Sequence, residues 1–263
     1  MIGETDSTTI AKRARISAIK MVHKANASHI GSSLSIIDIA AVIVSNCQLS
    51  ERIESGNDFV ISKGHAAAGI YAVLAEAGYI PYEWLDNYSG DNAFLGGHIT
   101  STNVKVLGLS TGSLGHGLPF ALGRAYARKM KSIDTNSYVV LSDGECDEGS
   151  NWEAALLAGH LKLNNLSVVI DRNGLQSLAA TEETVMLEPL VDKWKAFNWD
   201  VQECDGHDHK ELAAAIFRVS EKPRMTIANT IKGYGVSFMK NSVKWHYKVP
   251  NKEEMLAAIA ELD

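Results

Sequence analysis

The stretch from Tyr138 to Gln176 constrains the fold of this chain more than any other part of the sequence. A β-branched apolar run, YVVL, ends at Ser142-Asp143-Gly144, a turn that can bring backbone close to a ligand. An apolar-rich segment over 152–163 predicts a helix, and a second apolar run over 166–170 predicts a strand. This order is typical of a parallel α/β unit. We therefore expect an α/β fold with a doubly wound, mainly parallel sheet flanked by helices.

Two polar side chains follow these predicted strands. Asp143 and Asn173 are 30 positions apart (173 − 143), about one βαβ repeat, so neighbouring strand ends can present them side by side. Ligands of such sheets bind beyond the carboxyl ends of the strands. A carboxylate and an amide oxygen, with a backbone carbonyl and two phosphate oxygens, suit an octahedral magnesium ion. The pattern predicts a site for a metal-bound diphosphate.

An EF-hand calcium loop is the alternative for the acidic segment that starts at Asp143. Such a loop needs Gly at its sixth position and Glu at its twelfth, but this chain has Glu148 and Ala154 there. A strand precedes the segment where an EF-hand has a helix, so this alternative is excluded. Taken alone, the Asp-Gly pair would indicate only a turn.

The Asp-Gly pair and the later Asn together resemble the fingerprint of thiamine diphosphate enzymes. Further segments resemble the transketolase branch of that family: Lys63-Gly64-His65, Gly96-Gly97-His98, Thr111 to Leu118 and Trp245-His246. The resemblance extends from about Ala11 to Pro250 and covers only the first, diphosphate-binding domain of a full-length transketolase. It implies one diphosphate-binding domain over residues 1–263.

The resemblance also implies roles for individual residues. The metal, Mg²⁺ or else Ca²⁺ or Mn²⁺, would be held by Asp143, Asn173 and the Leu175 carbonyl. Thiamine diphosphate would be bound by His65, Gly112, Ser113, Leu114, Gly144, Glu145, Asn173 and Leu175. The residues implied to serve catalysis are His29, His65, His98 and His246, with His65 nearest the cofactor. Imidazole suits this work because it exchanges protons near neutral pH.

The chain departs from the family pattern at several positions. Ser142 replaces the first glycine of the usual Gly-Asp-Gly, and Ile30 and Ile99 stand where loop prolines are usual. The departures bear more on fine substrate geometry than on cofactor binding. Glu148 and Glu153 match a carboxylate network between paired active sites, or else they belong to a solvated helix face.

The activating glutamate of the family lies in a second, pyrimidine-binding domain, which this sequence does not contain. We therefore expect a C-terminal partner subunit, in a heterotetramer of two chains of each kind. The implied reaction transfers a two-carbon ketol unit from a ketose, often phosphorylated, to an aldose. Two alternatives remain open: another thiamine diphosphate enzyme half, such as one like 1-deoxyxylulose-5-phosphate synthase or one that decarboxylates 2-oxo acids, and a non-catalytic cofactor-binding subunit.

Charge, hydropathy and cysteine content argue against several other classes of protein. The net charge is −6 with no Lys/Arg-rich run, which argues against nucleic-acid binding. No run of eighteen apolar residues predicts a membrane span, and the polar first ten residues lack a secretion signal. Three scattered cysteines favour a reducing, cytoplasmic location.

The remaining pattern predicts further elements. Helices are expected over 8–25, 33–46, 118–130, 210–219 and 252–262, and strands over 58–62, 199–203 and 225–231. We interpret His207 and His209 as parts of a turn and helix cap rather than as metal ligands, because no third ligand has suitable spacing. The amphipathic last helix is expected to cover a sheet edge.

Overall fold

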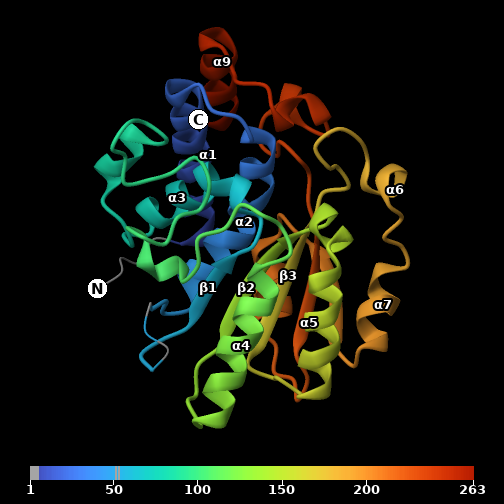
Figure 1. Ribbon diagram of the computed structural model, residues 1–263. Coiled ribbons are helices and arrows are strands. Elements are labelled where there is room, and N and C mark those ends of the chain that lie inside the picture. The colour runs from blue at the N-terminus through green and yellow to red at the C-terminus, as the bar shows by residue number, and fades with distance from the viewer. Residues whose placement is uncertain (1–5, 51, 53) are drawn as a thin grey trace.

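The computed structural model describes residues 6–50, 52 and 54–263. Five parallel strands form a sheet in the order β1-β2-β3-β5-β4 (Figure 1). Their bounds are β1 Asp58–Ile61, β2 Ser137–Ser142, β3 Leu166–Arg172, β4 Asp200–Asp205 and β5 Arg224–Asn229. The α-helices are α1 Ser7–Ala25, α2 Ile30–Asn46, α3 Ala67–Glu76, α4 Gly117–Met130, α5 Gly149–His160, α6 Thr181–Thr184, α7 Leu190–Ala196, α8 His209–Ile216 and α9 Lys252–Leu262. The predicted α/β class with a parallel sheet is confirmed.

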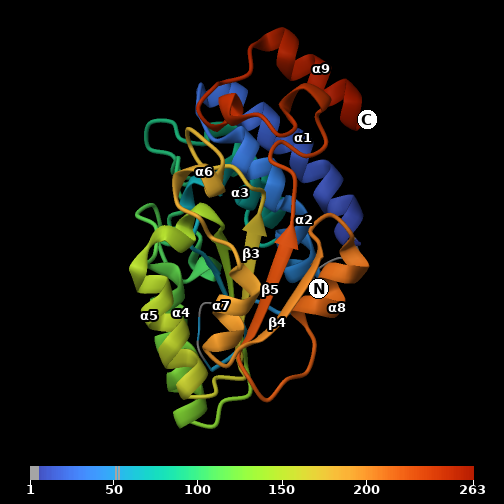
Figure 2. The same ribbon diagram turned by 90° about the vertical axis from the view of Figure 1, so that its right-hand side faces the viewer.

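Strand order explains why helices cover both faces of the sheet. The chain steps from β1 to β2 to β3 in one direction, and then from β4 back to β5 in the other. Parallel crossovers are right-handed, so reversing the direction moves the connecting helix to the opposite face. Helices α4 and α5 lie on one side of the sheet and α8 lies on the other (Figure 2).

Each central strand is buried on both faces. Along β2, Tyr138 and Val140 belong to the core shared with α1, α2 and α3, whereas Val139 and Leu141 belong to the core shared with α4 and α5. Successive side chains of a strand point to opposite faces, so a strand between two helical layers is apolar throughout. For this reason the sequence of β2 from Tyr138 to Leu141 contains no polar side chain facing solvent.

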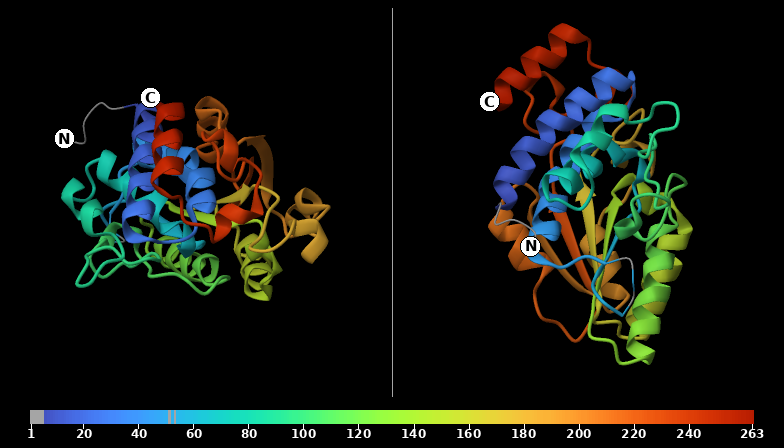
Figure 3. Two further views of the ribbon diagram at one scale, coloured as in Figure 1. Left: turned by 90° about the horizontal axis from the view of Figure 1, so that it is seen from above. Right: turned by 90° about the vertical axis from the view of Figure 1, so that its left-hand side faces the viewer.

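The helix ends follow local capping chemistry. The Asp6 carboxylate accepts from the backbone of Thr8 and Thr9 and so starts α1. Asn251 and Glu254 form a capping box at the start of α9. The predicted bounds of α9 are confirmed, but its predicted position is wrong: α9 packs against α1 and not on a sheet edge (Figure 3).

All five strands end at the same side of the molecule, because all are parallel. The arrowheads of β3 and β5 point towards α6 and the segment that precedes α9 (Figure 2). The loops that carry the polar motifs therefore meet at the carboxyl edge of the sheet. None of the helices in the described part of the chain is long and apolar enough to cross a membrane.

Candidate active site

A cavity of about 270 Å³ opens at the carboxyl ends of the strands. Most of the residues singled out from the sequence line it, although they come from segments far apart in the chain. They are His29, His65, His98, Gly112, Leu114, Asp143, Gly144, Asn173, Leu175 and His246. Ser32, Lys63, Ser142, Gln176, Ser177, Lys232 and Tyr247 complete the lining. The sheet edge thus gathers acidic, amide, basic and imidazole groups around one space.

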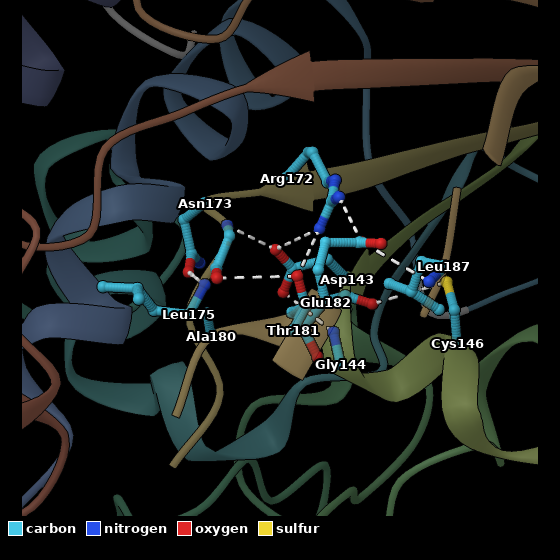
Figure 4. Close-up of polar contacts among 12 residues, drawn as sticks. Asp143, Gly144, Cys146, Arg172, Asn173, Leu175, Ala180, Thr181, Glu182 and Leu187 are labelled. Atoms are coloured by element: carbon cyan, nitrogen blue, oxygen red, sulfur yellow. Dashed lines mark hydrogen bonds and ion pairs between the residues drawn. The ribbon is translucent and has the colours of Figure 1, made fainter. Parts of the chain in front are cut away.

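Asp143 lies at the end of β2, where the carboxylate meets backbone donors from two strand ends. The Gly144 N–H donates to Oδ1 at 2.8 Å, and the Gly174 N–H donates to Oδ2 at 2.6 Å. The Arg172 guanidinium lies 3.5 Å from the same Oδ2 (Figure 4). Because β2 and β3 pair in parallel, with Ser142 opposite Asp171, the predicted adjacency of the Asp143 and Asn173 segments is confirmed.

The donor set fits a divalent cation that shares its coordination with a diphosphate. Asp143 is only 1% exposed, and burial, with repulsion from Asp171 adding to it, raises the pKa of its carboxyl. A cation would relieve this burial of charge. The Asn173 Oδ1 accepts from the Leu175 N–H at 3.1 Å, and both residues line the cavity. Among the described residues no group of three His, Cys, Asp or Glu can hold a metal by itself, so such an ion would depend on amide, backbone and diphosphate oxygens.

Two buried lysines add positive charge to the cavity. Lys63 is 1% exposed and forms an ion pair with Asp171 at the end of β3. Lys232 follows β5, and its Nζ donates to the Leu175 carbonyl at 3.1 Å and to the Gln176 carbonyl at 3.2 Å. Burial, with the charge of Lys63 as the next cause, lowers the pKa of Lys232 to about 8. The sequence-based site residues did not include these two ammonium groups, although Lys63 lies in the Lys63-Gly64-His65 segment that was singled out.

The glycine loop over 112–117 is fixed by one buried carboxylate. Glu145 accepts from the Gly115 N–H at 2.8 Å, from the Ser142 N–H at 3.2 Å and from the Ser62 hydroxyl. Gly115 has φ +81°, a conformation that favours glycine. Glu145 therefore ties the glycine loop to the end of β2. Glu145 itself does not line the cavity, and because its side chain is buried in these bonds, only its backbone is left for the predicted contact with the diphosphate.

Three other residues named from the sequence have exposed side chains. Ser113 is exposed and does not line the cavity, unlike its neighbours Gly112 and Leu114. Glu148 and Glu153 have exposed side chains at the start of α5 and in its first half. Gly112 faces the cavity, with room for a Cβ that would meet His98 at an ordinary 3.6 Å.

Four histidines of the cavity lining form a cluster. The ring centroid of His29 lies 5.4 Å from that of His65, 5.6 Å from that of His98 and 5.0 Å from that of His246. His29 has φ +72° at the start of α2, and its N–H donates to the His246 carbonyl at 2.8 Å. His29, His65, His98 and His246 are thus confirmed to lie together, although the first and last are far apart in the sequence.

His29, His65 and His246 are neutral at neutral pH. Burial lowers the pKa of His29 to about 4, and the neighbouring His98, Lys232 and Lys63 add to the effect. Burial and Lys232 lower the pKa of His246 to about 3. The pKa of His65 is also well below its usual value, because of burial and the nearby Lys63. Neutral imidazoles can each accept and donate a hydrogen bond, which suits hydroxyl groups of a substrate.

We expect the imidazole of His29 to titrate with a midpoint near pH 4 in the folded chain, against 6.5 in the unfolded chain. Between these values the unfolded chain binds more protons, so the free energy of unfolding falls as the pH falls from 6.5 towards 4. NMR titration of the imidazole C–H signals, assigned with His29→Gln, measures this midpoint. A midpoint near 6.5 in the folded protein would contradict the buried position.

His207 and His209 have a function in packing that the sequence did not reveal. The interpretation as a turn and cap holds for Asp208, which caps α8, but both imidazoles bind the buried Asp38 carboxylate. The Nδ1 of His207 lies 2.7 Å from Asp38 Oδ2, and its Nε2 accepts from the Ile231 N–H at 2.9 Å. The cluster ties α2 to the loop after β5. The sequence does not reveal this role, because Asp38 is 169 positions from His207 and meets it only in the folded chain.

Comparisons with known proteins agree with this geometry. Residues 6–261 match the family model described as the thiamine diphosphate binding domain of transketolase. The chain belongs to the transketolase family. A relative from Actinobacillus succinogenes, named as one subunit of an apulose-4-phosphate transketolase, is 42% identical over 240 residues, covering 89% of this chain and 87% of that protein. A Clostridium relative named 6-deoxy-6-sulfo-D-fructose transketolase subunit SqwG is 37% identical, covering 93% of this chain and 92% of that one.

Solved transketolases share the fold. The Campylobacter jejuni transketolase superposes with a TM-score of 0.88 at 28% identity, covering 96% of this chain but only 42% of the other. The chain therefore spans about two fifths of that transketolase, whereas it matches most of the length of the two relatives that are named as subunits. The family assignment made from the sequence, the thiamine diphosphate-binding fold and the relation to transketolase subunits are confirmed.

Proposed function

We propose that this chain is the N-terminal subunit of a two-subunit transketolase that moves a two-carbon ketol unit from a ketose to an aldose. The observation that carries the proposal is one cavity whose lining combines Asp143 and Asn173 with four histidines. The oxygen ligands suit a metal-bound diphosphate and define the diphosphate end of the proposed site, and the imidazoles suit the hydroxyl and carbonyl groups of a sugar and define its histidine end. We infer one diphosphate-binding domain over residues 1–263 in a cytoplasmic enzyme.

At the diphosphate end, we assign Asp143, Asn173 and the Leu175 carbonyl to a divalent cation, with Mg²⁺ favoured by the all-oxygen set. The backbone of Gly144 and Glu145 would meet the diphosphate, and the Lys63 and Lys232 ammonium groups would offset its charge. His65, Gly112, Ser113 and Leu114 complete the proposed cofactor contacts. When bound, thiamine diphosphate supplies the carbanion chemistry of ketol transfer.

At the histidine end, this chain would bind the sugar and move protons. His29, His98 and His246 line the cavity, and the neutral imidazole of His29 can accept a proton from a substrate hydroxyl. The Nδ1 of His246 accepts from the Lys232 ammonium at 3.0 Å, so the neutral ring carries its proton on Nε2 and can donate it in a hydrogen bond to the substrate. His246 is only 8% exposed, which limits the access of bulk water to its ring.

The names of the subunit-type relatives imply a second subunit, and we infer that it supplies the pyrimidine-binding half with the activating glutamate. We infer a heterotetramer of two chains of each kind. The relatives act, by name, on apulose 4-phosphate and on 6-deoxy-6-sulfo-D-fructose, so a small sugar or sugar phosphate is the proposed substrate class.

Calorimetry tests the cofactor part of this proposal. Thiamine diphosphate with Mg²⁺ is titrated into the purified chain, alone and with a candidate second subunit encoded beside it. We expect tight binding only with the second subunit, at one cofactor for each pair of chains, and a mass of two chains of each kind by light scattering. Ketol transfer is then compared for xylulose 5-phosphate and for pyruvate, the donor that a decarboxylating enzyme would prefer. A folded complex that binds no cofactor would contradict the proposal.

A further inference from the structure

Tyr247 is an aromatic residue of the cavity lining to which the proposed reaction gives no role. It directly follows His246 and lines the cavity. Its ring centroid lies 4.7 Å from that of His246 and 5.8 Å from that of His29. The side chain is 55% exposed, whereas His246 is 8% exposed. The phenol therefore lies at the outer edge of the histidine cluster, between the buried imidazoles and the opening of the cavity.

Lys248 follows Tyr247 in sequence, and its ammonium pairs with Glu254 of α9 and lies 4.4 Å from the centre of the Trp245 ring. Burial holds the nearby His29 and His246 neutral, with pKa values of about 4 and about 3. Within the described part of the chain, no hydrogen bond occupies the Tyr247 hydroxyl. The group is thus an uncharged aromatic face with an available hydroxyl.

These features match one part of a sugar substrate. A phenol ring offers an apolar face to C–H groups, and its hydroxyl can donate or accept one hydrogen bond. An anionic terminus is bound best by a cation, and the phenol carries no charge. Tyr247 contacts the rings of His29 and His246 and is more exposed than either, so the ketol unit that these imidazoles would bind lies deeper in the cavity than the phenol. What reaches Tyr247 is the chain of hydroxylated carbons beyond that unit.

We propose that Tyr247 is a specificity-determining residue that contacts the uncharged, hydroxylated carbon chain of the sugar substrate. The inference rests on the proposed ketol-transfer function and deepens it. Tyr247 would favour donors with a hydroxylated chain over donors that carry the ketol unit alone. It would not discriminate between phosphorylated and unphosphorylated sugars, because it offers no charge to the terminus.

Steady-state kinetics of the two-subunit complex test this with three donors. Xylulose and xylulose 5-phosphate differ only in the terminal phosphate, and hydroxypyruvate carries the ketol unit with no hydroxylated chain. For Tyr247→Ala we expect KM for both xyluloses to rise by the same factor, about tenfold, as loss of one aromatic contact and one hydrogen bond predicts. KM for hydroxypyruvate should change less than twofold. Tyr247→Phe should recover part of the loss.

Tyr82 provides a matched control, because it is also 55% exposed and does not line the cavity. Tyr82→Ala should leave all three KM values within twofold of those of the unsubstituted complex. In Tyr247→Ala, the affinity for thiamine diphosphate and co-purification with the second subunit should be unchanged. These two measurements separate substrate contact from a role in assembly or cofactor binding.

Each other outcome overturns the inference. An equal rise in KM for hydroxypyruvate would show that Tyr247 positions the histidines rather than contacting the carbon chain. A rise in KM restricted to xylulose 5-phosphate would indicate a contact with the phosphate. Weaker assembly would assign Tyr247 to the subunit interface. Unchanged kinetics for Tyr247→Ala with an active unsubstituted complex would refute this inference alone. If the unsubstituted complex turns over no ketose, the proposed function fails and the inference fails with it.

Discussion

Asp143→Asn is expected to weaken binding of thiamine diphosphate with Mg²⁺ to the two-subunit complex by at least about a hundredfold, or about 3 kcal/mol. The Asp143 carboxylate is the charged member of the proposed donor set, and it is 1% exposed. Removing one charge from a buried, hydrogen-bonded pair costs about 2–5 kcal/mol of binding. The amide retains the size of the side chain, so the loss reports charge. Calorimetry of cofactor and metal together measures it.

The control for this substitution is Asp134→Asn, which makes the same chemical change at an exposed position before β2, at the opposite end of the strands. Its affinity for cofactor should match that of the unsubstituted complex. Circular dichroism and thermal unfolding establish that both variants are folded. If Asp143→Asn binds cofactor and metal as tightly as Asp134→Asn, the metal assignment is wrong.

Lys63→Met is expected to cost about 3–5 kcal/mol of unfolding free energy at pH 7, because it leaves the Asp171 carboxylate buried without its cation. The side chains of Lys63 and Asp171 are 1% and 0% exposed, and Asp171 also accepts from Ser35 and Thr230. Burial alone would raise the pKa of Asp171, but Lys63 and these hydroxyls hold it below the usual 3.8. The contribution of the pair is therefore present above pH 3.8 and is lost as the pH falls through the lowered value.

Urea unfolding of the chain without cofactor measures this loss of unfolding free energy. Two further variants separate the effect of the buried charge from that of losing an ion pair in general. Lys63→Met with Asp171→Leu removes both charges and should recover part of the loss. Lys24→Met breaks the exposed pair with Asp86, whose side chains are 63% and 81% exposed, and should cost about 0–1 kcal/mol. Equal losses for Lys63→Met and Lys24→Met would show that the buried pair does not support the fold.

The sequence predicted the elements of this fold because their signals are local. Continuous apolar runs indicated strands buried on both faces, as Tyr138 to Leu141 illustrates. Helix α9 begins and ends where the pattern placed it, because its capping box lies within four residues of sequence. The adjacency of Asp143 and Asn173 also followed, since one βαβ repeat places consecutive strands side by side.

The resemblance to transketolases indicated most of the cavity residues, but it could not give their contacts. The buried pair joins residues 108 positions apart, and the bond between His207 and Asp38 joins residues 169 apart. No periodicity or turn signal encodes such pairs, which depend on how helices pack over the sheet. The packing also placed α9 on α1, against expectation.

The sequence by itself therefore determined the strand and helix segments, the edge of the sheet at which the polar motifs meet, and the family. Only the tertiary structure decided that Lys63 and Lys232 are buried beside the diphosphate end and that burial holds His29 and His246 neutral. It also placed Tyr247 at the cavity edge. The physical reason is that segment type depends on neighbours in sequence, whereas charge state and side-chain contact depend on burial, which is created when distant segments pack together.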